Sequence, residues 1–559
     1  MRVLRRRRNR REPAAGSSER RPPAAQAARL PGPRGYTGAG CGADLFIDTP
    51  VMWRGSTFQV CGLWPWLLGS SSPRNAAPLG RHMVTHEMVC ADPLSYFKGG
   101  LITNPSLILL GLNGYGKSSL LRRIAAAVTA FGAVPLILGD LKGEFVPMIR
   151  ALSGQVVRLG PGRGCLNLLD IADVVQAAQR LPRRVREEVV SHAIANRQDI
   201  LLSLIQLRRG EAPTETEENI IAEALAILDE GTGDTGTPSV LSDLVTVIEQ
   251  APERLRKVAR DRGELGRYQD RTDGLIESLN RVINDRELGP TFNGQTTETL
   301  LVDRPAVIDV SYFEDSPLRV QGTVLTACWG IAMSLVDLAQ ALADEGVERR
   351  IHQLVIMDEL WRPMRAAPRM VQRIDSLTRL NRTKGAGTMK CTHTMSDFLA
   401  LGTEEERQIA IGFLERAGIV LCAALPAREF PLLEQAIDLS RAEQALLESW
   451  QQPPTMDASS LDKVSFDDSD QGREWLGDGW ERPTGGDQHT APHKIHPGVG
   501  NFLLKPRGRP GLPFCMTLYP AEETWHDTSQ RWHEPTTKTR VHHDEQPANG
   551  NRPEPELAS

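Results

Sequence analysis

Short apolar runs alternate with helical patterns over most of the chain, and this alternation predicts a mostly parallel β-sheet with helices packed against it. The expected strands are apolar runs bounded by polar or glycine-rich segments. They are Leu107–Leu110, Val134–Leu138, Gln155–Leu159, Ala306–Val310, Leu354–Met357, Thr388–Thr392 and Gly418–Cys422. The later segment Asn501–Pro520 also has strand-like character. The pattern therefore predicts an α/β fold.

A long region in the middle of the chain interrupts this alternation. Between Ile171 and Glu287, apolar residues recur at helical spacing while charged residues cover the other faces. We therefore expect a core in two pieces, residues 90–170 and 288–450, with a helical insertion at 171–287. Composition predicts a disordered Arg/Pro/Ala-rich tail at 1–50, a linker at 451–497, a C-terminal strand segment at 498–532 and a disordered tail at 533–559.

Composition excludes some classes of protein but does not identify the binding partner of this chain. The 559 residues are 40% hydrophobic, enough for a sizeable core, and no apolar run approaches the ~18 residues that span a bilayer. The 8 cysteines include no CxxC pair, which favours a reducing cytoplasm and gives no zinc signature. The net charge of -5 neither demands nor excludes nucleic acid. We expect a cytoplasmic protein without an integral membrane segment.

The N-terminal tail is basic, with consecutive arginines at Arg5–Arg8. It either acts as an arm that binds nucleic acid or anionic lipid, or is disordered without a specific function. Its composition also resembles translated GC-rich DNA upstream of a start codon, in which case Met52 or Met83 would begin the protein. It is not a secretory signal, because no apolar stretch follows the arginines.

The first candidate site is a glycine-rich segment between the strand that ends at Leu110 and a helix-like stretch. Its residues are Gly111, Leu112, Asn113, Gly114, Tyr115, Gly116, Lys117, Ser118 and Ser119. This spacing matches a phosphate-binding P-loop, in which backbone N–H groups and a helix N-terminus bind the phosphates of ATP. Lys117 would reach the β- and γ-phosphates, and Ser118 would hold Mg²⁺. The alternative is a glycine-rich turn that happens to contain Lys-Ser.

A second candidate cluster follows the apolar strand Leu354–Met357. Asp358 and Glu359 come directly after it, at the end of a strand where ligands bind in open α/β sheets. Asp358 is expected to bind Mg²⁺ through water, and Glu359 to polarise the attacking water as general base. The alternative is a strand that ends in a solvated acidic turn. Together with Lys117, the two acids indicate ATP hydrolysis rather than nucleotide binding alone.

Further motifs along the chain give a sharper resemblance than the P-loop does. They are Gly139–Phe145, Arg158–Gly162, Leu166–Asp170 and Gly289–Gly294. This succession resembles the ATPases of bacterial conjugation and type IV secretion, the TraC/TraG-like members of the HerA–FtsK superfamily, in their actinobacterial soluble version. It covers about Cys90 to Trp450, and Leu168 stands where the family usually has proline. The resemblance implies a RecA-like P-loop core that hydrolyses ATP with Mg²⁺.

The resemblance also implies roles for residues outside the two clusters. Asp140 and Lys142 are expected to orient a phosphate or the neighbouring subunit, unless they form a simple Asp-Gly turn. Many relatives carry a glutamine that senses the γ-phosphate, and this chain has Thr392 and His393 there. His393 either offers the same hydrogen bond or only satisfies the start of a helix at Ser396.

Members of the superfamily act as rings, so the resemblance implies a homo-oligomer, expected to be a hexamer. An arginine from one subunit then completes the site of the next. The candidates are Arg379, Arg382 and Arg509, of which Arg382 is assigned as the catalytic arginine.

The resemblance implies a ring motor that moves DNA or protein, docked on a conjugation or secretion complex at the inner face of the cell membrane. Two alternatives stay open at this point. One is a chromosomal HerA-like DNA translocase, and the other is a nucleotide switch or assembly ATPase without a DNA substrate.

Overall fold

The computed structural model describes residues 72–235, 237–366, 371–372, 374–375, 385–452 and 498–526. The predictions for residues 1–50, for 453–497 of the linker and for the tail at 533–559 lie outside the described residues. The described residues all belong to one compact unit.

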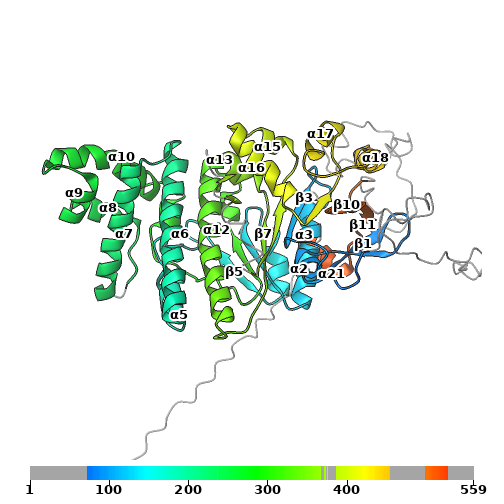
Figure 1. Cartoon of the computed structure of the whole chain (residues 1–559), viewed down its shortest axis with the longest axis horizontal. Coiled ribbons are helices and arrows are strands. Elements are labelled where there is room, and N and C mark those ends of the chain that lie inside the picture. The colour runs from blue at the N-terminus through cyan, green and yellow to red at the C-terminus, as the bar shows by residue number, and fades with distance from the viewer. Residues whose placement is uncertain are drawn as a thin grey trace, which may run out of the picture. The chain divides into compact units, whose positions relative to one another are not determined.

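Among the described residues, eleven strands form one sheet in the order β2-β1-β11-β10-β9-β3-β8-β7-β4-β6-β5 (Figure 1). They are β1 (Pro78–His82), β2 (Met88–Cys90), β3 (Ser106–Leu110), β4 (Val134–Asp140), β5 (Gln155–Arg158), β6 (Ala306–Asp309), β7 (Gln353–Met357), β8 (Gly387–Cys391), β9 (Ile419–Cys422), β10 (Asn501–Pro506) and β11 (Leu512–Cys515). From β9 to β5 in this order, neighbouring strands are parallel. At the other side, β10, β11, β1 and β2 add an antiparallel extension to β9. The predicted α/β fold with a mostly parallel sheet is confirmed.

Every strand predicted from the hydrophobic pattern is present, with bounds that differ by a residue or two. The strand-like C-terminal segment contributes β10 and β11. Strands β1 and β2 were not predicted, because one contains Pro, Gly, Arg and His and the other is only 3 residues long.

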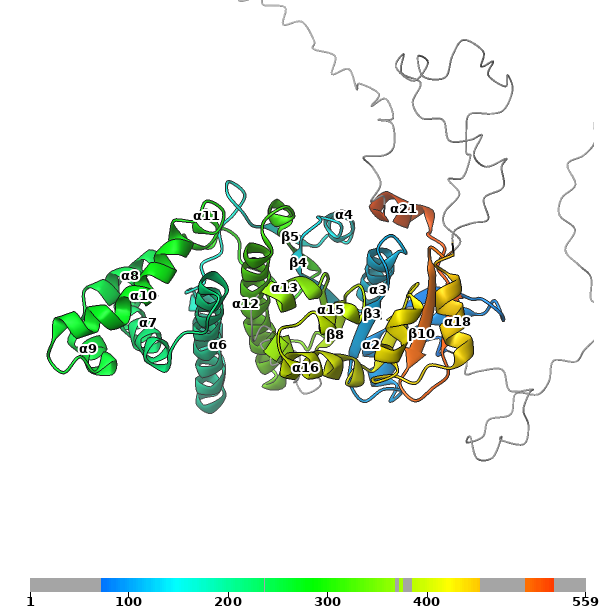
Figure 2. The same ribbon diagram turned by 90° about the horizontal axis from the view of Figure 1, so that it is seen from above.

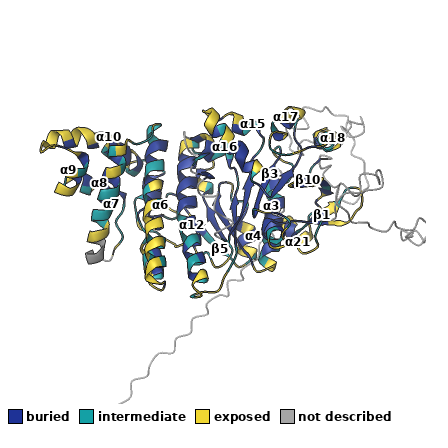
Figure 3. Ribbon diagram, viewed as in Figure 1, coloured by how far each residue is buried: buried dark blue, intermediate teal, exposed yellow. Residues whose placement is uncertain are grey.

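Helices cover both faces of the sheet, because successive side chains of a strand point to opposite faces. On one face, Leu107 and Leu109 of β3 pack in a core with α2 (Pro93–Lys98), α3 (Lys117–Ala130) and α4 (Val146–Ala151). On the other face, Ile108 and Leu110 belong to a second core that includes α12 (Leu318–Asp344). That second core also takes in residues of α13 (Trp361–Ala366), α15 (Ser396–Leu399), α16 (Glu404–Glu415), α17 (Phe430–Leu433) and α18 (Arg441–Ser449), and it continues into the helices between β5 and β6. Figure 3 shows the strands almost entirely buried between these layers.

A group of helices lies between β5 and β6 in the sequence, where the pattern predicted almost pure helix (Figure 2). They are α5 (Ala172–Ala178), α6 (Arg183–Arg209), α7 (Glu215–Thr235), α8 (Leu241–Glu249), α9 (Glu253–Ala259), α10 (Leu265–Ile283) and α11 (Gly289–Phe292). α6 packs along α12, and α10 packs against α6, α7, α8 and α9. The helical group is therefore attached to the sheet layer through the α6–α12 contact.

Helix α12 is long and apolar enough, by composition alone, to cross a membrane. The hydrophobic pattern had not singled it out. However, 72% of its most apolar window is buried inside the protein, as is usual for a helix that covers the face of a sheet. Its apolar character is accounted for by packing against the sheet and α6.

Candidate nucleotide-binding site

The P-loop segment joins β3 to α3, as its spacing predicted. Gly116 precedes the helix with φ of 90°, a left-handed conformation that favours glycine. Gly111 passes so close to the end of β9 that an added Cβ would lie 2.5 Å from Cβ of Ala423. Asn113 and Gly114 at the tip are exposed. The loop thus presents the N-terminus of a 14-residue helix to solvent, an arrangement that suits an anion.

Lys117 lies at the start of α3 with only 8% of its surface exposed. Its Nζ donates to the carbonyl of Leu112 at 3.0 Å and to Oδ1 of Asn113 at 3.4 Å, and lies 3.2 Å from Nδ1 of His393. Ser118, in the first turn of the helix, is half-buried. The lysine therefore folds back over the loop, within reach of any phosphate bound there.

Asp358 and Glu359 follow β7, two strands away from β3 in the sheet. Because these strands are parallel, their carboxyl ends meet at one edge, and the two acids share that edge with the P-loop. Asp358 is half-buried and accepts the backbone N–H of Glu359 at 2.9 Å. Glu359 is 6% exposed and has a left-handed φ of 50°, which is strained for a residue with a side chain. The two acids do not form a solvated turn.

His393 follows β8, the strand between β3 and β7. Its Nδ1 contacts Lys117, and its Nε2 lies 3.1 Å from Oε2 of Glu359. The backbone N–H of Ser396 instead donates to Glu429 at 3.0 Å. The helix start at Ser396 therefore has its own partner, and His393 joins the two candidate clusters.

Asp140 and Lys142 lie at the end of β4, the next strand beyond β7. Asp140 accepts the backbone N–H groups of Glu144 at 3.1 Å and Phe145 at 2.7 Å, which closes a turn. Lys142 donates to Oε1 of Glu359 at 2.6 Å. The turn interpretation thus describes Asp140, whereas Lys142 points into the acidic cluster.

Three carboxyl groups at this edge have pKa values shifted away from those of exposed side chains. Burial raises the pKa of Asp140 to about 7, although the N–H of Phe145 acts in the opposite direction and the charge of Asp358 adds to the rise. Burial and the charge of Glu359 also raise the pKa of Asp358. Burial alone would raise the pKa of Glu359, but the hydrogen bond from His393 and the charge of Lys142 hold that pKa well below its usual range.

A magnesium ion fits the donors that the sequence predicted for it. No cluster of three or more His, Cys, Asp or Glu side chains suited to a metal exists among the residues that the structure describes. Mg²⁺ in nucleotide sites uses one or two protein oxygens and keeps water and phosphate as its other ligands. Ser118 and Asp358 supply a hydroxyl and a carboxylate, and the acids crowded around Asp358 favour a cation there.

Of the three arginine candidates, the structure describes Arg509 alone. Arg379 and Arg382 lie outside the described residues. Arg509 lies in the turn between β10 and β11. Because Pro506 of β10 pairs with Ile419, the first residue of β9, that turn lies at the amino ends of the parallel strands. The structure therefore places Arg509 at the edge opposite its own P-loop.

Sequence reasoning missed Trp361, whose indole Nε1 donates to Oε2 of Glu359 at 2.6 Å. It also missed Gly500, whose N–H donates to the carbonyl of Tyr115 in the P-loop at 3.3 Å. Trp361 is adjacent to the acids in sequence, but nothing in its spacing marks it as a contact. Gly500 is far away in sequence, so only the strand pairing reveals it.

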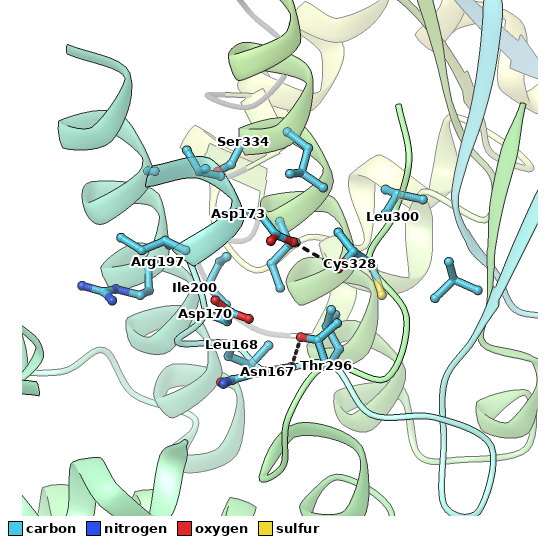
Figure 4. Close-up of a pocket in the computed structure, with 18 of the residues that line it drawn as sticks. Asn167, Leu168, Asp170, Asp173, Arg197, Ile200, Thr296, Leu300, Cys328 and Ser334 are labelled. Carbon is cyan, nitrogen blue, oxygen red and sulfur yellow. Dashed lines mark hydrogen bonds between the residues drawn. The ribbon is translucent and has the colours of Figure 1, made fainter. Parts of the chain in front are cut away.

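The motif Leu166–Asp170 follows β5 at one end of the sheet and so lies apart from the P-loop after β3. Figure 4 shows Asn167, Leu168 and Asp170 of this motif beside helices α6 and α12. Its backbone N–H at Asn167 donates to Thr296 at 3.1 Å, and the amide of Asn167 donates to the carbonyl of Ser239 at 3.0 Å. Asn167 and Asp170 line a cavity of ≈ 70 Å³ between β5, α5, α6 and α12. This motif therefore organises a junction rather than the phosphate site.

The strand order and the loop between β3 and α3 define a P-loop fold with a RecA-like core. No protein-family model and no curated protein sequence matches the chain. Among solved structures, the chain is similar to VirB4 of Thermoanaerobacter pseudethanolicus, with a TM-score of 0.54 and 17% identity over 81% of this chain and 100% of that one.

The plasmid coupling protein TrwB in complex with ADP and Mg²⁺ matches more weakly, with a TM-score of 0.41 and 13% identity over 74% of this chain and 85% of TrwB. The fold assignment therefore rests on VirB4. It confirms, for the fold, the resemblance to conjugation and type IV secretion ATPases.

Proposed function

We propose that the chain is a Mg²⁺-dependent ATPase of the conjugation or type IV secretion type, working as a ring, with a hexamer as the expected form. The observation that carries the proposal is the convergence of Lys117, Asp358, Glu359 and His393 at one edge of the sheet. A solvated acidic turn would not hold Glu359 at 6% exposure against Lys142 and His393.

In the proposed reaction, water attacks the γ-phosphate in line with the leaving ADP. The P-loop N–H groups and Lys117 bind the phosphates, while Ser118 and Asp358 would hold Mg²⁺, which would neutralise charge on the phosphate oxygens. Glu359 aligns the water and takes its proton. His393 lies where it could contact the γ-phosphate, and Arg382 of a neighbouring subunit remains the proposed source of further positive charge.

We extend the proposal to the organisation of the chain. Residues 90–170 and 288–450 form the ATPase core, and 171–287 is a helical insertion that contacts the transported substrate. We propose that this substrate is DNA, with protein as the alternative, and that the ring docks on a membrane-bound secretion complex. The fold of VirB4 supports this placement among secretion ATPases.

Two substitutions test the chemistry. Lys117→Ala is expected to abolish hydrolysis and weaken ATP binding, because the cation that neutralises the phosphates is lost. Glu359→Gln is expected to bind ATP normally while turnover falls roughly 100-fold or more, the usual contribution of a general base. Steady-state hydrolysis and equilibrium binding of a nucleotide analogue measure both effects. Normal turnover by Glu359→Gln would remove it from the role of base.

The substrate is tested by measuring hydrolysis with and without single- and double-stranded DNA, using Lys117→Ala as the blank. Stimulation by DNA supports a nucleic-acid motor. A hydrolysis rate that DNA does not change favours protein transport or a nucleotide switch.

A further inference from the structure

The carboxylate of Glu359 is held by side chains from three separate segments of the chain. Lys142, after β4, donates to Oε1 at 2.6 Å, and Trp361 in α13 donates to Oε2 at 2.6 Å. His393, after β8, reaches the same Oε2 at 3.1 Å. Only 7% of the Glu359 side chain is exposed. Both oxygens therefore already accept hydrogen bonds, and an attacking water competes with these partners for the carboxylate.

The backbone of Glu359 indicates that this arrangement is imposed by its surroundings. Its φ of 50° lies in the left-handed region, which a residue with a side chain adopts only where tertiary contacts maintain it. Loss of those contacts would let the backbone relax and carry the carboxylate to a new position.

Lys117 belongs to the same network. An ammonium group has three donors and no acceptor, and three acceptors surround it: the carbonyl of Leu112, Oδ1 of Asn113 and Nδ1 of His393. Because Lys117 can only donate, Nδ1 of His393 must accept, and a neutral imidazole then carries its hydrogen on Nε2. That hydrogen is donated to Glu359, so one ring links the P-loop lysine to the acid.

A nucleotide must disturb this network in order to bind. The phosphates of a P-loop ligand use the donors of the lysine, and all three donors of Lys117 already have acceptors. A phosphate oxygen therefore displaces at least one acceptor. Among the three, His393 is the one that also contacts Glu359.

We propose that Lys142, Trp361 and His393 are positioning residues that restrain Glu359 until a nucleotide phosphate engages Lys117. This inference rests on the proposed function, since it assigns a resting state to the base of that reaction. Loss of the Lys117 contact lets the imidazole of His393 turn away from Glu359. The carboxylate then leaves Lys142 and binds the attacking water. Lys142 thus sets how often the base is released.

The first test replaces Lys142. Lys142→Met keeps an unbranched side chain only one heavy atom shorter but removes the charge-assisted hydrogen bond, which shifts the balance between held and released Glu359 by roughly tenfold. We expect kcat for ATP to rise roughly tenfold with little change in KM, and Lys142→Arg to return kcat towards the wild-type value. A kcat that is unchanged, or that falls without rescue by arginine, overturns the restraint.

A matched control is available on the surface of α9. Lys257 pairs with Glu253 at 2.7 Å, with 73% and 81% of the two side chains exposed. Lys257→Met removes the same charge from the protein without touching the site, and it is expected to leave kcat and KM unchanged.

Trp361 offers a readout that does not depend on turnover. The difference in fluorescence between the wild type and Trp361→Phe isolates the emission of this indole. We expect a non-hydrolysable ATP analogue to change that emission, because the partner of the indole moves. His393→Ala is expected to bind the analogue while losing the change. An equal change in His393→Ala contradicts a link through the imidazole.

These tests separate the restraint from the proposed function. If Lys117→Ala and Glu359→Gln both hydrolyse ATP as fast as the wild type, the proposed function fails. If both are inactive while Lys142→Met matches the wild type, only the restraint fails.

Discussion

At the scale of single residues, Asp140 shows what folding does to a carboxyl group at this site. It is 3% exposed, and burial raises its pKa from 3.8 to about 7, partly opposed by the N–H of Phe145. The folded chain therefore binds this proton more tightly than the unfolded chain does. Since unfolding releases the proton between these two pKa values, the contribution of Asp140 to the free energy of unfolding decreases as the pH rises through that window.

Asp140→Asn removes this titration. In metal-free buffer, we expect the free energy of unfolding of the wild type relative to that of the variant to decrease between pH 3.8 and about 7. The contribution of Asp140 is roughly 1–4 kcal/mol, and the variant should lose that part of the pH dependence. Urea denaturation at several pH values measures it. The asparagine oxygen can still accept the N–H of Phe145, so the turn is expected to persist. Identical pH profiles for the two proteins would contradict the assignment.

The residues that could be predicted from the sequence are those whose role is local. Lys117 and Ser118 are recognised from their own loop, and Asp358 and Glu359 from the apolar strand before them. The partners of Glu359 could not be predicted, because Lys142 and His393 reach it from other strands. Their positions depend on the order of strands in the sheet, which the hydrophobic pattern does not encode.

At the scale of elements, the C-terminal helix α21 (Pro520–His526) is fastened to the P-loop helix α3. Arg123 of α3 donates to Oε1 of Glu522 at 2.8 Å and to the carbonyls of Leu79 and Thr517. Its guanidinium also lies 4.9 Å from the centre of the Tyr519 ring. One buried arginine thus ties α3 to both β1 and the C-terminal segment.

Arg123→Met is expected to destabilise the protein by about 3–5 kcal/mol, because it leaves the carboxylate of Glu522 buried without its cation. The control is Arg183→Met, whose partner Glu187 and own side chain are 63% and 84% exposed. That exposed pair contributes at most about 0.5 kcal/mol. Thermal and urea denaturation of the two variants should differ accordingly, and equal stabilities would show that the buried pair contributes little.

The elements themselves were largely predictable. Buried parallel strands such as β3 and β7 consist mainly of consecutive apolar residues. This pattern distinguishes them in the sequence from amphipathic helices. Strand β1 was not predictable, because its sequence lacks a continuous apolar run. It contains proline, glycine and two polar residues, Arg81 and His82. Its strand conformation comes from pairing with β2 and β11, not from its own pattern.

At the scale of the whole molecule, Asn167 joins the sheet to the helical group. Its side chain bonds Ser239 ahead of α8 and the N–H of Leu169, and its backbone N–H bonds Thr296 on the returning chain. Asn293 also accepts the N–H of Ser242 at 2.9 Å. Asn167 is therefore one of several residues that fix the segments leaving and re-entering the core to one another.

Asn167→Ala is expected to loosen this junction while leaving the phosphate site intact. The substitution removes the hydrogen bonds that the Asn167 side chain makes with the carbonyl of Ser239 and the N–H of Leu169, each of which contributes about 0.5–1.5 kcal/mol. Hydrogen exchange should accelerate around residues 238–242 and 293–297, with nucleotide binding unchanged. If exchange instead accelerated across the sheet, Asn167 would support the core itself.

The position of β11 has a consequence for how the protein is made. Arg81 of β1 pairs with Cys515 of β11, and β10 pairs with β9 beside the P-loop strand. Strand β1 therefore cannot pair with β11 until nearly all of the described chain has been synthesised. Before β10 and β11 are made, β9 and β1 expose unpaired strand edges to other nascent chains. A message truncated before the codon for Asn501 would yield a polypeptide with the P-loop sequence and no completed sheet beside it, a product suited to degradation rather than assembly.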